Sequence, residues 1–131
     1  MKEKTVQRIT GDIGENFACE YLKKNGYEIV CRNFSCYYGE IDIIAQNSKY
    51  MAFVEVKTRR KNTMIRPCLS VNKSKQIKIM RTAYIYLRDN KSKLQPRFDV
   101  AEVYLENSNN KLYKINYIKN AFIQEDNYAN F

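Results

Sequence analysis

Histidine is missing from this sequence of 131 residues. Its absence excludes hydrolases that depend on a Ser-His-Asp or Cys-His arrangement, and it excludes nucleases in which histidine binds the metal. Any hydrolytic chemistry in this chain must therefore depend on carboxylates, lysines and a metal ion.

Cysteine is sparse, with four residues and no pair separated by two positions. A zinc site built from all four would have 11, 4 and 31 residues between successive ligands, which matches known zinc patterns poorly. No apolar run approaches the ~20 residues of a membrane span, and the charged start from Met1 to Lys4 is not followed by a signal-like segment. We expect no membrane partner, a reducing cytoplasmic location and structural thiols.

Positive charge is plentiful and concentrated. The formal net charge is +9, and the segment 57–97 holds 13 Lys and Arg against one acid, Asp89. Such a segment suits a polyanion, so we expect a nucleic acid as partner, whereas an ordinary solvated helix face is the alternative explanation. The length suits a single domain spanning residues 1–131.

Hydrophobic periodicity predicts an α/β fold with the element order α-β-β-β-α-β-β. We expect a mixed sheet flanked by helices, in which the third and fourth strands are the parallel pair joined through the second helix. The second helix should turn Ile77, Met80, Ala83, Tyr84 and Leu87 inward. The predicted helices are 5–24 and 72–89, a loop covers 59–70, and the strands are 27–32, 39–45, 50–58, 98–105 and 112–118.

Two of the predicted strands carry charges among residues that should be buried. Glu55 and Lys57 alternate with valines, so they project from one face of their strand. With Asn47-Ser48 as a two-residue turn, Asp42 lies opposite Phe53 and diagonal to Glu55 on that same face. One divalent ion could bridge two carboxylates so placed, as in a Mg²⁺-dependent phosphodiesterase. The alternative is a half-buried Glu55–Lys57 ion pair, with Asp42 at a solvated strand end.

Several motifs follow one another between about Gly11 and Val103. They are Gly11-x-x-Gly14-Glu15-x-x-Ala18, Tyr21-Leu22, Gly26-Tyr27, Arg32-Asn33, Gly39-Glu40-Ile41-Asp42, Phe53-Val54-Glu55-Val56-Lys57-Thr58-Arg59 and Arg97-Phe98-Asp99-Val100. In this order they resemble the YraN-like family of predicted bacterial endonucleases. That family is similar to archaeal Holliday-junction resolvases and belongs to the PD-(D/E)xK nuclease superfamily, so the resemblance implies a restriction-endonuclease-like fold.

The resemblance implies a role for each matching residue. Asp42 and Glu55 would bind Mg²⁺ or Mn²⁺, the carbonyl of Val56 would face the ion, and Lys57 would position the attacking water or stabilise developing charge. Glu15 matches an extra glutamate near the metal, although taken alone it would be an ordinary exposed helix acid. One departure is Ile65-Arg66-Pro67 where the family pattern has Gly-x-Pro, which affects substrate selectivity more than catalysis.

Further residues are candidates for contact with DNA. Tyr37 and Tyr38 would stack on unpaired bases, or else serve ordinary packing. Arg97 and Asp99 flank Phe98, where we expect a structural salt bridge. The cationic and polar candidates after the charged strand and at the second helix are Arg59, Arg60, Lys61, Lys73, Lys75, Gln76 and Lys78.

The sequence therefore predicts a Mg²⁺- or Mn²⁺-dependent DNA endonuclease, with branched or junction DNA favoured by the family resemblance. The alternative is a non-catalytic nucleic-acid-binding accessory protein in DNA processing or recombination. A basic RNA-associated module is a third interpretation, but it leaves the carboxylates unexplained. Symmetric cutting of two strands would need two sites and so would favour a homodimer.

Overall fold

A computed structural model of the chain describes residues 4–65 and 71–122. The order of helices and strands is the predicted one, with one additional short 3₁₀ helix, η1, after the third strand. The elements are α1 (Val6–Lys24), β1 (Glu28–Cys36), β2 (Gly39–Gln46), β3 (Tyr50–Arg60), η1 (Lys61–Ile65), α2 (Lys73–Asp89), β4 (Gln95–Leu105) and β5 (Leu112–Phe122).

The five strands form one mixed sheet in the order β1-β2-β3-β4-β5. β3 and β4 are parallel and are connected through α2, whereas the other neighbours are antiparallel. The predicted α/β fold and the parallel pair are therefore confirmed. No helix among the described residues is both long enough and apolar enough to cross a membrane.

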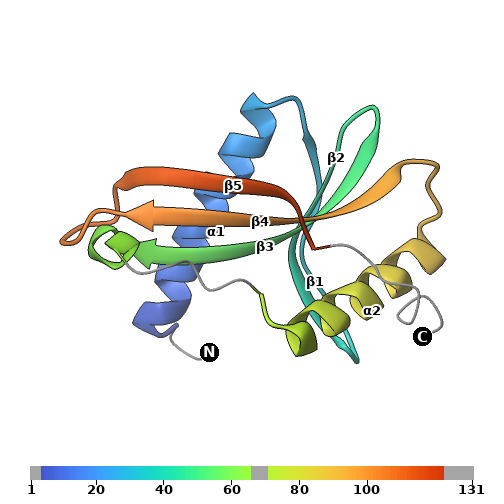
Figure 1. Cartoon of the computed structure of the whole chain (residues 1–131), viewed down its shortest axis with the longest axis horizontal. Helices are drawn as coiled ribbons and strands as arrows, with labels where there is room; N and C mark the ends of the chain where they lie inside the picture. Colours follow the sequence, from blue (N-terminus) through green and yellow to red (C-terminus); the bar gives the residue numbers. More distant parts are fainter. Residues whose placement is uncertain (1–3, 66–70, 123–131) are drawn as a thin grey trace.

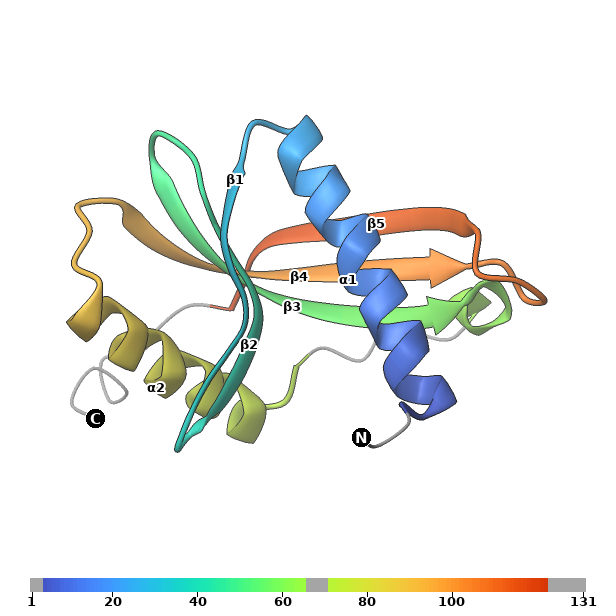
Figure 2. The ribbon, with the colours of Figure 1, turned by 180° about the vertical axis from the view of Figure 1, so that it is seen from behind.

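The two helices cover opposite faces of the sheet, so that α1 lies behind it in Figure 1 and in front of it in Figure 2. Because successive side chains of β3 point to opposite faces of the sheet, this strand contributes to the hydrophobic core on each face. Ala52 and Val54 pack in the cluster that contains Leu22 of α1. Met51 and Phe53 pack in the cluster that contains Met80 of α2.

Both helices begin at side-chain caps. Thr5 accepts a hydrogen bond from the backbone N of Arg8, and Asn72 accepts one from the backbone N of Lys75. Asn25 caps the end of α1 and is followed by Gly26 with φ of +87°, which confirms the predicted stop.

The predicted inner face of α2 was partly wrong. Tyr84 is 53 % exposed, whereas Ile79 and Tyr86 are buried. Tyr86 makes edge-on contacts with Phe34 and Phe53, so the sheet's aromatic side chains set the rotation of the helix.

Some boundaries also differ from prediction. β1 continues to Cys36 and β4 begins at Gln95, each longer than its periodic pattern indicated. The predicted loop 59–70 was wrong at its start, because β3 continues to Arg60 beside β4 and η1 follows. The departure from the family pattern extends into 66–70, which lie outside the described residues.

Arg97 and Asp99 form the expected structural ion pair, and both are buried. The guanidinium donates to Asp99 at 2.8–3.2 Å and to the hydroxyl of Tyr27 at 2.5 Å. The Asp99 carboxylate also accepts hydrogen bonds from the Tyr117 hydroxyl at 2.6 Å and the Asn120 backbone N at 2.9 Å. This network joins β4 and β5 to the chain that follows α1.

Candidate functional site

Asp42 lies on β2 at the point where β2 stops pairing with β3. The paired residues run from Gln46–Met51 to Ile43–Val54, and Asp42 is the next residue along β2. Its carboxylate Oδ2 then accepts a hydrogen bond of 2.8 Å from the backbone N of Val56. The side chain thus takes over a backbone donor where the ladder ends, which fixes it between the two strands.

The predicted register between these strands was wrong by two residues. Ile44, not Asp42, lies opposite Phe53, and continuing the register places Asp42 opposite Glu55. The turn is longer than expected because Asn47 Oδ1 accepts hydrogen bonds from the backbone N of Lys49 and of Tyr50. A shift of two residues preserves the face, so Asp42 and Glu55 are still neighbours.

Glu55 lies on β3 and connects the site to α2. Its Oε1 lies 3.4 Å from Nζ of Lys75, and only 12 % of the Glu55 side chain is exposed. Burial and the charge of Glu55 raise the pKa of Asp42 to about 7, against the opposing effects of the Val56 N–H and Lys75. The two carboxylates are therefore close enough to repel each other, and one lysine only partly compensates them.

Glu15 approaches the site from α1. It is 6 % exposed, so the interpretation of an exposed helix acid was wrong. Burial and then the charge of Asp42 raise its pKa, while Arg32 counters this through an ion pair of 3.3 Å. Asp42 is thus within electrostatic reach of Glu15 on α1 and of Glu55 on β3.

Gly14 explains how α1 comes so close to β3. A Cβ at this position would lie 1.8 Å from Oγ1 of Thr58 and 2.9 Å from its Cβ. Only glycine allows the helix to pack against this β-branched residue. Gly14 therefore allows α1 to pack closely against β3, and this close packing places the carboxylate of Glu15 at the site.

Lys57 and Arg59 follow Glu55 at alternating positions on the same face of β3. Both side chains are half-buried, and Lys57 makes no hydrogen bond or ion pair within 4–65 and 71–122. Nε of Arg59 is buried and has no hydrogen-bond partner in the same segments. An unpartnered lysine two residues from Glu55 on the same strand face is suited to a phosphate oxygen.

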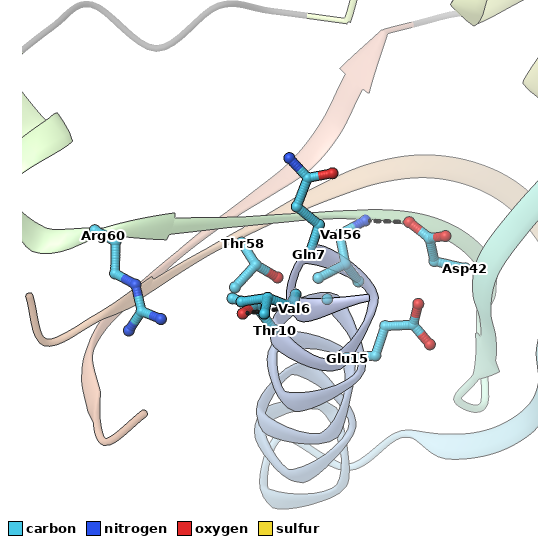
Figure 3. Close-up of a pocket in the computed structure, with 9 residues that line it drawn as sticks. Val6, Gln7, Thr10, Glu15, Asp42, Val56, Thr58 and Arg60 are labelled. Atoms are coloured by element: carbon cyan, nitrogen blue, oxygen red, sulfur yellow. Dashed lines mark hydrogen bonds between the residues drawn. The ribbon is translucent and has the colours of Figure 1, made fainter. Parts of the chain in front are cut away.

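A cleft of about 410 Å³ runs between α1 and the opposite face of β3. Figure 3 shows Asp42 and Glu15 at one end and Arg60 at the other. The lining residues are Val6, Gln7, Thr10, Gly11, Glu15, Asp42, Val56, Thr58 and Arg60.

The residues of this site lie within the part of the chain that matches a known protein family. The model described as "Uncharacterised protein family UPF0102" matches residues 14–103, which include Glu15, Asp42, Glu55 and Lys57. The chain belongs to the UPF0102 family. This is the YraN-like family that the sequence motifs resemble, so that prediction is confirmed. The UPF0102 match begins at Gly14 and ends on β4, so that β5 lies outside it.

Other UPF0102 proteins are similar over nearly their whole length. One from Clostridium acetobutylicum is 50 % identical over 119 residues, covering 89 % of this chain and 96 % of the relative. One from Caldanaerobacter subterraneus subsp. tengcongensis is 43 % identical over 121 residues, covering 92 % and 99 %. One from Caldicellulosiruptor saccharolyticus is 46 % identical over 117 residues, covering 88 % and 98 %.

The remaining candidates on β3 and η1 of this UPF0102 chain have partners within the protein. Arg60 donates to the backbone oxygens of Glu106 and Asn109 and to the side-chain oxygen of Asn110. Nζ of Lys61 lies 4.5 Å from the ring centroid of Tyr113. Both therefore stabilise the β4–β5 end of the sheet, and their contact with DNA stays a prediction.

The candidates on α2 differ in their surroundings. Lys75 reaches Glu55 as described, and Gln76 donates to the backbone oxygen of Val71 at 2.7 Å. Lys73 and Lys78 are exposed near the start of the helix. Sequence reasoning missed Arg32 as the partner of Glu15, although Arg32 belongs to one of the quoted motifs.

Proposed function

We propose that this UPF0102 protein hydrolyses phosphodiester bonds in DNA with the help of Mg²⁺ or Mn²⁺. The observation that carries the proposal is the meeting of Asp42 and Glu55 where β2 and β3 separate, with Lys57 following Glu55 on one strand face. Buried like charges side by side are costly, and proteins place them where a cation or a reaction uses them.

The donor set fits a divalent ion that prefers oxygen. Mg²⁺ commonly uses one or two carboxylates and completes its octahedron with water and substrate phosphate. Among residues 4–65 and 71–122, no three His, Cys, Asp or Glu side chains are grouped so as to hold a metal ion. Asp42 and Glu55, the two neighbouring carboxylates, would hold it, with the carbonyl of Val56 as a further ligand and Glu15 nearby. A bound ion would supply charge that stabilises a phosphoryl oxygen and acidifies water.

The cationic side chains would then act on the substrate. Lys57, which is without a protein partner among the described residues, would orient the attacking water or stabilise charge that develops on the phosphate. Arg59 follows Lys57 on the same strand face and would add positive charge for a phosphate there. The high positive charge of segment 57–97 supports a polyanionic substrate.

By analogy with the junction-resolving nucleases that the family resembles, branched DNA is the favoured substrate. Symmetric cutting of two strands would require two copies of the site, so a homodimer is the matching assembly. Sedimentation of the free protein and of its complex with a four-way junction would test this assembly.

A non-catalytic DNA-binding accessory protein is the second candidate. It is favoured by the Lys75–Glu55 ion pair, which already places one positive charge at the site. On this interpretation the carboxylates would be balanced by the protein itself, and the basic face alone would bind DNA.

Cleavage of labelled DNA distinguishes the two candidates. Linear duplex, single-stranded, flap and four-way-junction substrates would be incubated with Mg²⁺, Mn²⁺ or EDTA. We expect metal-dependent cutting that falls by about 10²–10³-fold in Lys57→Ala, the loss typical when one transition-state donor is removed. Lys91→Ala, which changes an exposed lysine after α2, is the matched control and should cut like the wild type.

Binding without cutting under every condition would support the accessory protein instead. A separate measurement of unfolding temperature with and without 10 mM Mg²⁺ tests the ion directly. Wild type should be stabilised, because a ligand that binds only the native state raises its stability, and Asp42→Asn should not respond. Equal responses of the two proteins would remove Asp42 from the metal site.

A further inference from the structure

An exposed aromatic pair forms the tip of the β1–β2 hairpin. Cys36 pairs with Gly39, so Tyr37 and Tyr38 are the two residues of the turn. Tyr37 is 96 % exposed, and its ring meets that of Tyr38 edge-on with centroids 5.5 Å apart. The tip therefore presents an almost fully exposed tyrosine ring to solvent, with the ring of Tyr38 packed beside it nearly at a right angle.

The hairpin is held against α2. Sγ of Cys36 lies 3.7 Å from Oγ1 of Thr82, and a Cβ at Gly39 would lie 3.8 Å from Cβ of Lys78. The guanidinium carbon of Arg81 lies 5.5 Å from the centroid of the Tyr38 ring. Figures 1 and 2 both show the tip beside α2. The aromatic pair thus has a fixed position next to the helix.

The same side of α2 carries a row of cations that leads back to the acidic site. Lys75, Lys78 and Arg81 are three residues apart and therefore neighbours on the helix surface. Lys75 contacts Glu55, and Arg81 contacts Tyr38. Arg81 lies six residues after Lys75, a rise of about 9 Å along the helix, or roughly three stacked base steps of 3.4 Å.

We propose that Tyr37 stacks on an unpaired base of a DNA strand whose phosphates follow this row of cations to Glu55. The inference rests on the proposed function and names its substrate class, which is DNA with an unstacked base close to the cut. An aromatic side chain can stack on any base that is out of the helical stack. In continuous duplex the base faces are covered by their neighbours, so this contact selects branched or single-stranded regions.

Fluorescence of 2-aminopurine tests the stacking without any need for cleavage. The probe base would be placed in an unpaired position of a branched oligonucleotide and in a fully paired duplex of the same sequence, both in EDTA. Wild type should quench the unpaired probe. Tyr37→Ser should lose about tenfold in affinity for the branched DNA and nothing for the duplex, because stacking is worth that much per base. Tyr37→Phe keeps the ring and should bind both like the wild type.

The variants should fold, because Tyr37 is almost wholly exposed, and unfolding temperatures would verify this. Unchanged affinity of Tyr37→Ser for the branched probe would overturn the inference, and so would an equal loss on both DNAs. Quenching by wild type that cannot cut DNA with Mg²⁺ would contradict the proposed hydrolysis but leave the stacking intact. Metal-dependent cutting with no effect of Tyr37→Ser on binding would support the proposed hydrolysis but contradict the stacking.

Discussion

Two aspartates on the same sheet differ in how far the protein compensates their charge. Asp99 on β4 is 0 % exposed and accepts hydrogen bonds from Arg97, Tyr117 and Asn120. Asp42 on β2 accepts a single hydrogen bond among the described residues, from the backbone of Val56, and faces other carboxylates. The first is compensated by its own protein and holds the fold together. The second leaves negative charge that a ligand could neutralise.

The difference shows which buried charge is structural and which is available for function. A buried carboxylate with complete hydrogen bonding and an arginine partner has nothing left to bind. A carboxylate whose pKa is raised by burial and by like charge is a candidate for a functional site. The first two substitutions below test this difference, one at each aspartate, and the third tests how α1 is placed against the site.

Asp99→Asn should have the largest effect on stability. It would leave the buried guanidinium of Arg97 without its counter-charge, and breaking such a pair costs about 3–5 kcal/mol. Urea unfolding at pH 7 measures the loss. Asp89→Asn is the matched control, because Asp89 and Arg88 form an exposed pair whose removal should leave stability unchanged. Similar results for the two variants would contradict a structural role for Asp99.

Asp42→Asn should increase stability at high pH, whereas Asp99→Asn decreases it. The native pKa of about 7 lies above the ordinary pKa of an aspartate, about 3.9, so the native state binds more protons between these pH values. The contribution of protonated Asp42 to the stability of the native state is therefore fully present below about pH 4, and it is lost as the pH rises through 7. The asparagine cannot ionise but can still accept from Val56, so at pH 8 the variant should be more stable by on the order of 3 kcal/mol.

Urea unfolding of wild type and Asp42→Asn at pH 4 and pH 8 measures this difference. The two proteins should have nearly the same stability at pH 4 and should separate at pH 8. The same variant should lose metal-dependent cleavage. A wild type whose stability rises between pH 4 and pH 8 relative to the variant would show that Asp42 is compensated after all.

Gly14→Ala should have a smaller effect, a loss of about 1–3 kcal/mol. Its methyl group would overlap Thr58 and push α1 away from β3, which is the cost of overpacking. Gly11→Ala is the control, because it lies in the same helix with no atom within 4 Å of an added Cβ. That change should stabilise the protein by about 0.5–1 kcal/mol, since alanine favours a helix over glycine. Differential scanning calorimetry of both variants would test the opposite signs.

Local patterns were sufficient to predict most of the fold. The start of α1 after Thr5 and that of α2 after Asn72 follow from cap residues that act within three positions. The strand-helix-strand connection made β3 and β4 the parallel pair. The register of β2 on β3 was missed because it depends on side-chain hydrogen bonds of Asn47 within the turn. The rotation of α2 was missed because Phe34 and Phe53, distant in sequence, position Tyr86.

The sequence by itself determined the family, the order of the elements and the concentration of charge, because motifs, periodicity and composition are local properties. It also determined that Glu55 and Lys57 share a face, because a strand alternates. Only the tertiary structure decided that Glu15 is buried beside Asp42, that Lys75 rather than Lys57 contacts Glu55, and that Arg60 is held by the β4–β5 turn. Burial and charge compensation depend on atoms that the fold brings together from distant positions, and the cost of a charge depends on those neighbours.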